Sequence, residues 1–193
     1  MLGKKHEFKP DRPDSGILNK LYLTKKQRRS ILKWLLYTAM LVLLSLVQDV
    51  IMSRVSIGGA TTDLMAGSIL LLCLLMNVET GALFVLVASM LFSFSGSAPG
   101  PYTILYLTVI GVIFSIFRHS YLRAGFLSVM LTAAAGIMLY QLLVFVTVLF
   151  LGQTTWQRFG YFCLSGLLTT ATLPAMYPIF SAIGKIGGES WNE

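Results

Sequence analysis

Few side chains in this sequence could do chemistry, and they form no known catalytic pattern. Cys73 and Cys163 each lie in the middle of an apolar segment, and His6 and His119 lie in polar segments. Metal sites and nucleophilic centres need several such groups at short, characteristic spacings. The sequence has no phosphate-binding glycine loop, no Gly-x-Ser-x-Gly turn and no His-Glu-x-x-His motif. We therefore expect a protein that is not an enzyme and binds neither a metal nor a cofactor.

Polar residues in or beside the apolar segments are stronger candidates for a role. Gln48 lies near the end of the first segment, and Asp63 opens the second. A carboxylate there caps free backbone N–H groups and faces the positive end of the helix dipole, with contact to Arg54 or to a partner protein as the alternative. Gln141, which follows Tyr140, is strongly polar and far from any helix end. We expect its amide to make an interhelical hydrogen bond worth roughly 0.6 to 2 kcal/mol, with ligand binding as the alternative.

Two features of the last two apolar segments bear on helix packing. The run from Ala133 to Gly136 contains only small residues, which permit close approach of another helix, either in this protein or in a partner. Pro174 and Pro178 stand four residues apart on one helix face. Because Pro174 removes a backbone hydrogen bond, we expect a structural kink there, with a moving hinge as the alternative.

These side chains belong to a chain suited to a membrane. Of its 193 residues 55% are hydrophobic and 12% are charged, whereas average soluble domains carry about 25% charged residues. The apolar segments cover residues 31–52, 62–76, 80–94, 102–117, 126–151 and 161–183. The sequence predicts an all-α integral membrane protein with six transmembrane helices in one bundle.

The second, third and fourth segments are short for a bilayer core of about 30 Å. A re-entrant hairpin would place Glu79 near the bilayer midplane, at a cost of about 2.5 to 3.5 kcal/mol. The flanking segments contain no Lys, Arg or His to compensate that charge. We therefore expect residues 77–80 to form a turn at the interface, with a crossing helix on each side.

The distribution of positive charge predicts the orientation. Nine of the fifteen Lys and Arg residues lie within residues 1–30. With six spans and a cytoplasmic N-terminus, Arg118, Arg123 and Lys185 are also inside, and only Arg54 and Arg158 are outside. Positively charged loops are retained in the cytoplasm, so both termini are predicted to be cytoplasmic.

The sequence divides into three parts around the predicted bundle. Residues 1–30 form a basic, partly disordered cytoplasmic arm, residues 31–186 form the membrane domain, and residues 187–193 form a short cytoplasmic tail. The juxtamembrane cluster of Lys25, Lys26, Arg28 and Arg29 fits a topogenic role and also attachment to anionic lipids, at about 1 kcal/mol per basic residue near the surface. We expect no nucleic-acid binding, because no folded domain presents these charges.

The order of these features resembles the MreD family of rod-shape-determining membrane proteins. The family pattern pairs a Gln near the end of the first helix with a loop ending Gly-x-x-Pro-Asp-Leu, matched here by Gln48 and by residues 59–64, with Thr62 in place of the usual Pro. Its later features are a glycine opening the third span, a small-residue loop, a tyrosine with a polar neighbour and prolines in the last span, which correspond to Gly81, Gly100, Tyr140 with Gln141, and Pro174 with Pro178. The resemblance covers residues 43–186. One departure is Ser93, where many members have Asp.

The resemblance implies a non-enzymatic scaffold subunit of the machinery that builds lateral peptidoglycan and maintains cell shape. The partners it implies are the bitopic protein MreC, the actin-like MreB filament, the glycosyltransferase RodA and a class B penicillin-binding protein. It also implies a fold like that of the substrate-binding subunits of energy-coupling-factor vitamin transporters.

Such a binding subunit is itself the alternative function. It would hold a small vitamin at its outer side, where this chain offers Asp49, Arg54, Asp63, Gln153, Trp156 and Arg158. Those subunits tend to carry Ala-x-x-x-Ala in the first helix, and Ala39 is the only alanine there in this chain.

Overall fold

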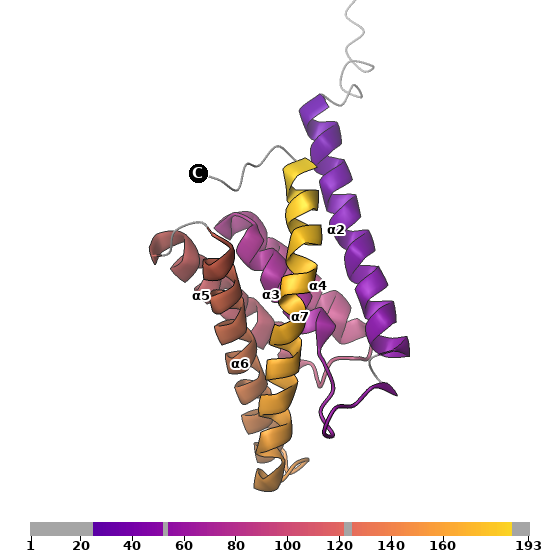
Figure 1. Cartoon of the computed structure of the whole chain (residues 1–193), viewed down its shortest axis with the longest axis vertical. Coiled ribbons are helices and arrows are strands. Elements are labelled where there is room, and N and C mark those ends of the chain that lie inside the picture. The colour runs from indigo at the N-terminus through magenta and orange to yellow at the C-terminus, as the bar shows by residue number, and fades with distance from the viewer. Residues whose placement is uncertain (1–24, 52–53, 122–124, 187–193) are drawn as a thin grey trace, which may run out of the picture.

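The computed structural model describes residues 25–51, 54–121 and 125–186, and the regular structure of these residues is helical, without strands (Figure 1). The elements are α2 (Lys25–Val50), α3 (Leu64–Leu75), α4 (Val78–Phe94), α5 (Tyr102–Tyr121), α6 (Phe126–Phe150), the 3-10 turn η2 (Trp156–Arg158) and α7 (Phe159–Ile186). The all-α prediction is confirmed. The tail 187–193 and all but the last six residues of the arm 1–30 lie outside the described residues, and α2 begins at Lys25 rather than at residue 31.

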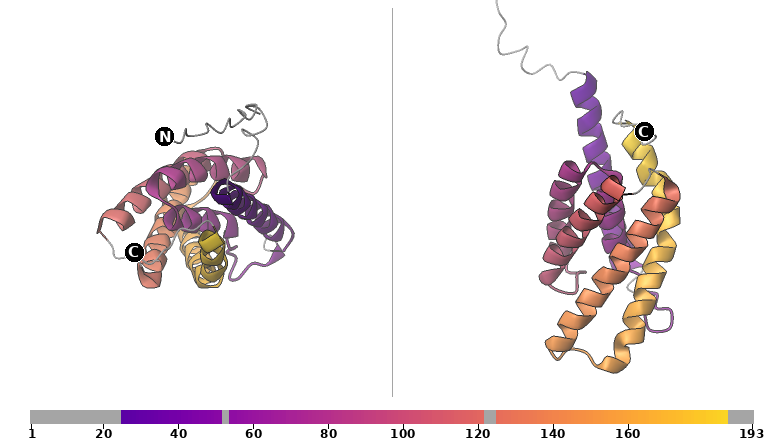
Figure 2. Two further views of the ribbon diagram at one scale, coloured as in Figure 1. Left: turned by 90° about the horizontal axis from the view of Figure 1, so that it is seen from above. Right: turned by 90° about the vertical axis from the view of Figure 1, so that its left-hand side faces the viewer.

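Successive helices run in alternating directions, so the start of α2 and the end of α7 lie at the same end of the bundle (Figure 1). We call this the termini end. The loops at residues 54–63, 95–101 and 151–158 gather at the opposite end, which we call the loop end. The hairpin of α6 and α7 reaches furthest at the loop end, and α2 reaches furthest at the termini end (Figure 2).

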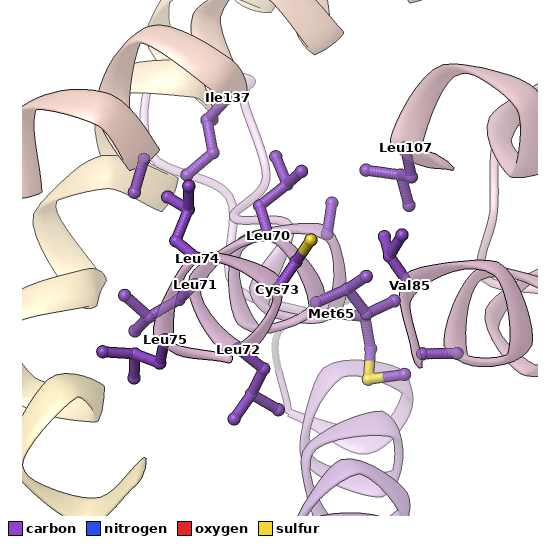
Figure 3. Packing of buried hydrophobic residues seen from close by; sticks show 14 of the residues in the cluster. Met65, Leu70, Leu71, Leu72, Cys73, Leu74, Leu75, Val85, Leu107 and Ile137 are labelled. Atoms are coloured by element: carbon purple, nitrogen blue, oxygen red, sulfur yellow. The ribbon is translucent and has the colours of Figure 1, made fainter. Parts of the chain in front are cut away.

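Helix α3 lies at the centre and packs against α2, α4, α5, α6 and α7. Its sequence is apolar on every side, the pattern of a helix surrounded by others, and all of its residues are buried. Figure 3 shows its leucine side chains directed outward, with Val85, Leu107 and Ile137 of the neighbouring helices around them.

Glycine and alanine let the neighbouring helices come close to α3. A Cβ atom at Gly81 would lie 2.8 Å from the backbone oxygen of Cys73, too close for any side chain, so this glycine fixes the crossing of α3 and α4. Ala133 and Gly136 are buried, and Gly136 faces Ile110 and Leu70. Ala133 and Gly136 therefore serve packing within this protein, whereas Ala135 of the same stripe is exposed.

Four segments are long and apolar enough to cross a membrane: Ser30–Val50, Tyr102–Tyr121, Phe126–Phe150 and Trp156–Ile186. They identify an all-α membrane protein by length and composition. Helix α3 has 12 residues and α4 has 17, and at 1.5 Å per residue α3 is only about 18 Å long. The count of six spans stays a prediction.

The last helix continues through both of its prolines. Pro174 and Pro178 lie inside α7 and are exposed on its outer side. The hydroxyls of Thr170 and Thr172 donate to the carbonyl oxygens of Gly166 and Thr169, at 2.8 and 2.7 Å. These bonds hold the threonine side chains against the helix just before Pro174. The kink and the hinge stay predictions.

Cysteine labelling tests the predicted orientation and span count. In a background with Cys73→Ala and Cys163→Ala, we expect Gln157→Cys at the loop end to react with a membrane-impermeant maleimide in intact cells. Glu79→Cys, at the connection of α3 and α4, should react only after permeabilisation, because that connection lies at the termini end. Labelling of Glu79→Cys in intact cells would contradict the orientation. No labelling under either condition would contradict six spans.

Candidate functional site

The N-terminus of α3 is held by two side chains from different parts of the chain. Asp63 is the N-cap, and its Oδ1 accepts a hydrogen bond from the backbone N–H of Ala66 at 3.0 Å. Gln48 of α2 accepts from the N–H of Met65 through Oε1 at 2.7 Å and donates from Nε2 to Asp63 Oδ1 at 3.4 Å. The first N–H groups of a helix have no partner within it, and these bonds satisfy two of them. We call Gln48 and Asp63 the clasp.

Helix α7 contacts the same segment from the other side. The Thr169 hydroxyl oxygen accepts from the backbone N–H of Asp63 at 2.9 Å, and the Ser165 hydroxyl donates to the carbonyl oxygen of Thr61 at 2.6 Å. Thr169 is ten residues into α7, so the clasp lies about 15 Å along that helix from its loop end. The start of α3 is thus recessed into the bundle.

A glycine turn lets the loop before α3 fold back into the bundle. Ile57 and Ala60 pair through two backbone hydrogen bonds of 2.9 and 3.1 Å. Gly58 and Gly59 between them have φ of 60° and 83°, a conformation that glycine adopts without steric cost. A Cβ atom at Gly59 would also lie 3.0 Å from a ring carbon of Tyr161. These constraints favour glycine at position 59.

A cavity of about 390 Å³ opens between the clasp, the loops and helices α6 and α7. Polar side chains in its wall include Gln48, Thr61, Asp63, Ser97, Gln141 and Ser165. A neighbouring hollow of about 550 Å³ shares part of this wall and continues to the loop between α4 and α5. Ser97 in that loop donates a hydrogen bond to the carboxylate of Asp49, so this side of the cavity is also fixed by α2.

Gln141 lies in the cavity wall, and 7% of its surface is exposed. The predicted interhelical hydrogen bond is absent: its amide bonds to no residue of the described part of the chain. Beside it Tyr140 is fully buried, and its hydroxyl lies near that of Thr103 without a hydrogen bond of normal geometry to a described residue. The polar neighbour of the tyrosine therefore faces the cavity, while the tyrosine fills the core.

The clasp confirms the predicted cap at Asp63 and places Gln48, Asp63 and Gln141 around one cavity. The other candidates lie elsewhere. Gly81, Ala133, Gly136 and Tyr140 are buried between helices, Gly100 packs against the ring of Tyr102, and Pro174 and Pro178 are exposed on α7. Arg28 is exposed in the first turns of α2, and the side chains of Lys25, Lys26 and Arg29 lie outside the described part of the chain.

Two contributors, Thr169 and Arg118, are not among the site residues that the sequence predicts. Nothing in the sequence connects Thr169 to Asp63 across more than a hundred residues. The sequence predicts only that Arg118 lies on the cytoplasmic side, but in the structure 7% of its surface is exposed and its guanidinium donates to the carbonyl oxygen of Leu74. A cation there complements the negative end of the α3 dipole. Both ends of α3 are therefore tied to neighbouring helices.

The cavity offers hydrogen bonding rather than acid–base or metal chemistry. Asp63 is the charged group in its wall, and Arg54 and Arg158 are exposed residues that do not line it. No three His, Cys, Asp or Glu side chains of residues 25–51, 54–121 and 125–186 gather as metal ligands. The wall can hold a polar molecule or chain segment through amides, hydroxyls and one carboxylate.

Comparison with known proteins gave no match: no family model fits the chain, and no curated protein or solved structure is significantly similar to it.

Substitutions in the clasp should lower the free energy of unfolding, and the size of the loss should depend on which hydrogen bond is removed. We expect Asp63→Ala to cost about 1 kcal/mol because the cap is lost, and Asp63→Asn to cost little because asparagine caps as well. Gln48→Ala leaves the buried N–H of Met65 without its partner, at a cost of about 1 to 3 kcal/mol. Unfolding of the purified protein in mild detergent, followed by tryptophan fluorescence, measures these differences.

Gln153→Ala is the matched control, because Gln153 lies in the same cavity wall and its side chain makes no hydrogen bond to a described residue. Its effect should stay within about 0.5 kcal/mol. Equal stability of the wild-type, Gln48→Ala and Asp63→Ala proteins would show that the clasp does not hold α3.

Proposed function

We propose that this protein is a non-enzymatic scaffold subunit of the bacterial rod complex, as its resemblance to the MreD family implies. In this role it supports lateral peptidoglycan synthesis and cell shape by binding an MreC-like bitopic protein, with RodA-like and penicillin-binding partners in the membrane and an MreB-like filament in the cytoplasm. The proposal is supported by the positions of the motif residues: Gln48, Asp63 and Gly81 all contact or fix the central helix α3.

The observation that carries the proposal is the one-sided packing of α2. Tyr37, Leu41 and Leu44 are buried against the bundle, whereas the opposite face is exposed along the helix. A shallow groove lies on this exposed face in the first half of α2, and its lining includes Thr38 and Ala39.

This groove suits a transmembrane helix of a partner. The remaining walls are Ile31, Trp34 and Leu35, and the Thr38 hydroxyl donates to the carbonyl oxygen of Trp34 at 3.0 Å, so the surface presents little polarity. Helices associate in membranes where small residues let backbones approach closely. We propose that the helix of the MreC-like protein packs here.

The distribution of positive charge supports a cytoplasmic location for the termini end. Lys33, Arg118 and Lys185 lie towards that end of the described structure, and Arg54 and Arg158 lie at the loop end. On the positive-inside rule we propose that the loop end and its cavity face away from the cytoplasm.

The cavity favours the alternative function, a vitamin-binding subunit of an energy-coupling-factor transporter. Its volume of about 390 Å³ is within the range of about 300 to 1,000 Å³ for small-molecule pockets. In that case Asp63 and Gln141 are ligand residues, and an ATPase with its coupling protein is the partner.

A substitution in the α2 groove tests the scaffold proposal. We expect Ala39→Phe to reduce co-purification of an MreC-like protein about tenfold, because the ring fills the groove and a loss of about 1 to 2 kcal/mol in helix packing has that effect. Affinity purification in mild detergent with quantitative mass spectrometry measures the ratio of the two proteins.

Leu131→Phe is the matched control, because Leu131 is exposed on α6, a different helix from the one that carries the groove. It should leave the ratio unchanged. Recovery of a stoichiometric vitamin or an ATPase–coupling-protein pair, with no cell-wall partner, would contradict the scaffold and support the alternative.

A further inference from the structure

The polar cavity at the loop end has one charged group in its wall. Asp63 is a carboxylate, and no Lys, Arg or His side chain of the described residues lines the cavity. Arg54 and Arg158 lie at the same end, but both are exposed and neither is part of the wall. The dipole of α3 is equivalent to about half a positive unit charge at its N-terminus, so it offsets only part of the carboxylate. The cavity therefore favours a positively charged occupant.

The two oxygens of this carboxylate have different surroundings. Oδ1 accepts hydrogen bonds from Ala66 and Gln48 and so holds the start of α3. Oδ2 has no hydrogen bond to a described residue, and it is not enclosed by protein atoms. Asp63 can therefore cap α3 with one oxygen and accept from a ligand with the other.

Gln141 gives a second, independent indication of a ligand. It is more than nine-tenths buried, its amide makes no hydrogen bond to a described residue, and neither amide atom is enclosed by protein. Its stem packs against α7, where a Cβ atom at Gly166 would lie 3.5 Å from Cγ of Gln141. The apolar groove that also borders Gln141 presents no polar atoms, so the amide faces the polar cavity. There it can donate to a ligand and accept from it.

The uncharged part of the wall indicates what accompanies the positive charge. The hydroxyls of Thr61, Thr62, Ser97 and Ser165 line the cavity. The Ser165 hydroxyl donates to the carbonyl oxygen of Thr61, so its own oxygen can still accept. Hydroxyl groups of a ligand can pair with such a wall as donors or as acceptors. An occupant with several hydroxyl groups fits it better than an apolar one.

The size and depth of the cavity favour a small molecule. Its volume is about 390 Å³, which is within the range of about 300 to 1,000 Å³ for small-molecule pockets. The clasp at its inner end lies about 15 Å along α7 from the loop end. A side chain of a partner that docks on the loops would have to bridge that depth, whereas a small molecule can enter whole.

We propose that the polar cavity is a binding site for a small organic cation, a polyhydroxylated amine in its protonated form. The ammonium group donates to Oδ2 of Asp63, and the hydroxyl groups pair with the amide of Gln141 and with the hydroxyls of the wall. The site lies apart from the groove on α2, so it goes beyond the scaffold function and does not rest on it. It also names a ligand class, which the alternative function leaves open.

Calorimetric titration of the purified full-length protein, in a detergent without sugar groups, tests the site with three matched probes. Glucamine, sorbitol and gluconate have the same six-carbon chain with hydroxyl groups, and at one end they carry an ammonium, a hydroxyl and a carboxylate. We expect glucamine to bind about tenfold more tightly than sorbitol, because a charge-assisted hydrogen bond replaces a neutral one. Gluconate should bind more weakly than sorbitol.

Two substitutions assign the roles of the side chains. Asp63→Asn keeps the cap of α3 and removes the charge, so it should weaken glucamine about tenfold and change sorbitol by less than about twofold. Gln141→Leu removes the amide and should weaken both probes about threefold to fivefold. Glu79→Gln is the matched control, because it removes a carboxylate at the opposite end of the bundle, and it should bind as the wild type does. Melting temperatures show whether each variant is folded.

Three outcomes would overturn the proposal: equal affinity for glucamine and sorbitol, tightest binding of gluconate, or no binding of any probe to the wild-type protein. Unchanged glucamine binding by folded Asp63→Asn would overturn it as well. The comparison of the three probes needs no variant, so it decides even if a substitution prevents folding. None of these outcomes bears on the α2 groove, and the scaffold function is judged separately by co-purification.

Discussion

The structure depends on the burial of one short helix. Helix α3 is about 18 Å long in a protein whose other long helices match a bilayer core of about 30 Å, and all of its residues are enclosed by five neighbours. Its end groups are satisfied by its own cap and by side chains of neighbouring helices. Gln48 of α2 and the cap Asp63 do this at one end, and Arg118 of α5 does it at the other.

The cavity follows from this arrangement. Because α3 begins about 15 Å inside the bundle while α6 and α7 extend to the loop end, the space between the N-terminus of α3 and the loop end is not filled by a helix. The loop 54–63 and Ser97 close part of it, and the remainder is lined by hydroxyl and amide groups. Gln141 faces this space from α6. Gln48 and Asp63 thus hold the start of α3 and line the cavity at the same time.

Much of the order of helices along the chain can be predicted from the apolar segments and from the capping residues that precede them. The apolar segment at residues 62–76 and the acid at its start predict a capped helix, and α3 with Asp63 matches them. Contacts between segments that are distant in the sequence cannot be predicted in this way. Gln48 and Asp63 form one clasp only because α2 and α3 lie side by side. The environment of Gln141 also depends on where α3 begins. A glutamine in the middle of a helix can face either a neighbouring helix or a cavity, and the sequence pattern is the same in both cases. The described structure assigns Ala133 and Gly136 to internal packing and leaves Ala135 exposed, a distinction that the spacing of the small residues does not make.

Hydrogen exchange in the first turn of α3 tests the central claim most directly. The N–H of Met65 has Gln48 as its partner, so the account predicts faster exchange at Met65 in the Gln48→Ala protein than in the wild type, with protection at Leu72 unchanged in the helix core. Equal exchange at Met65 in the two proteins would contradict the claim that a side chain of α2 holds the recessed end of the central helix.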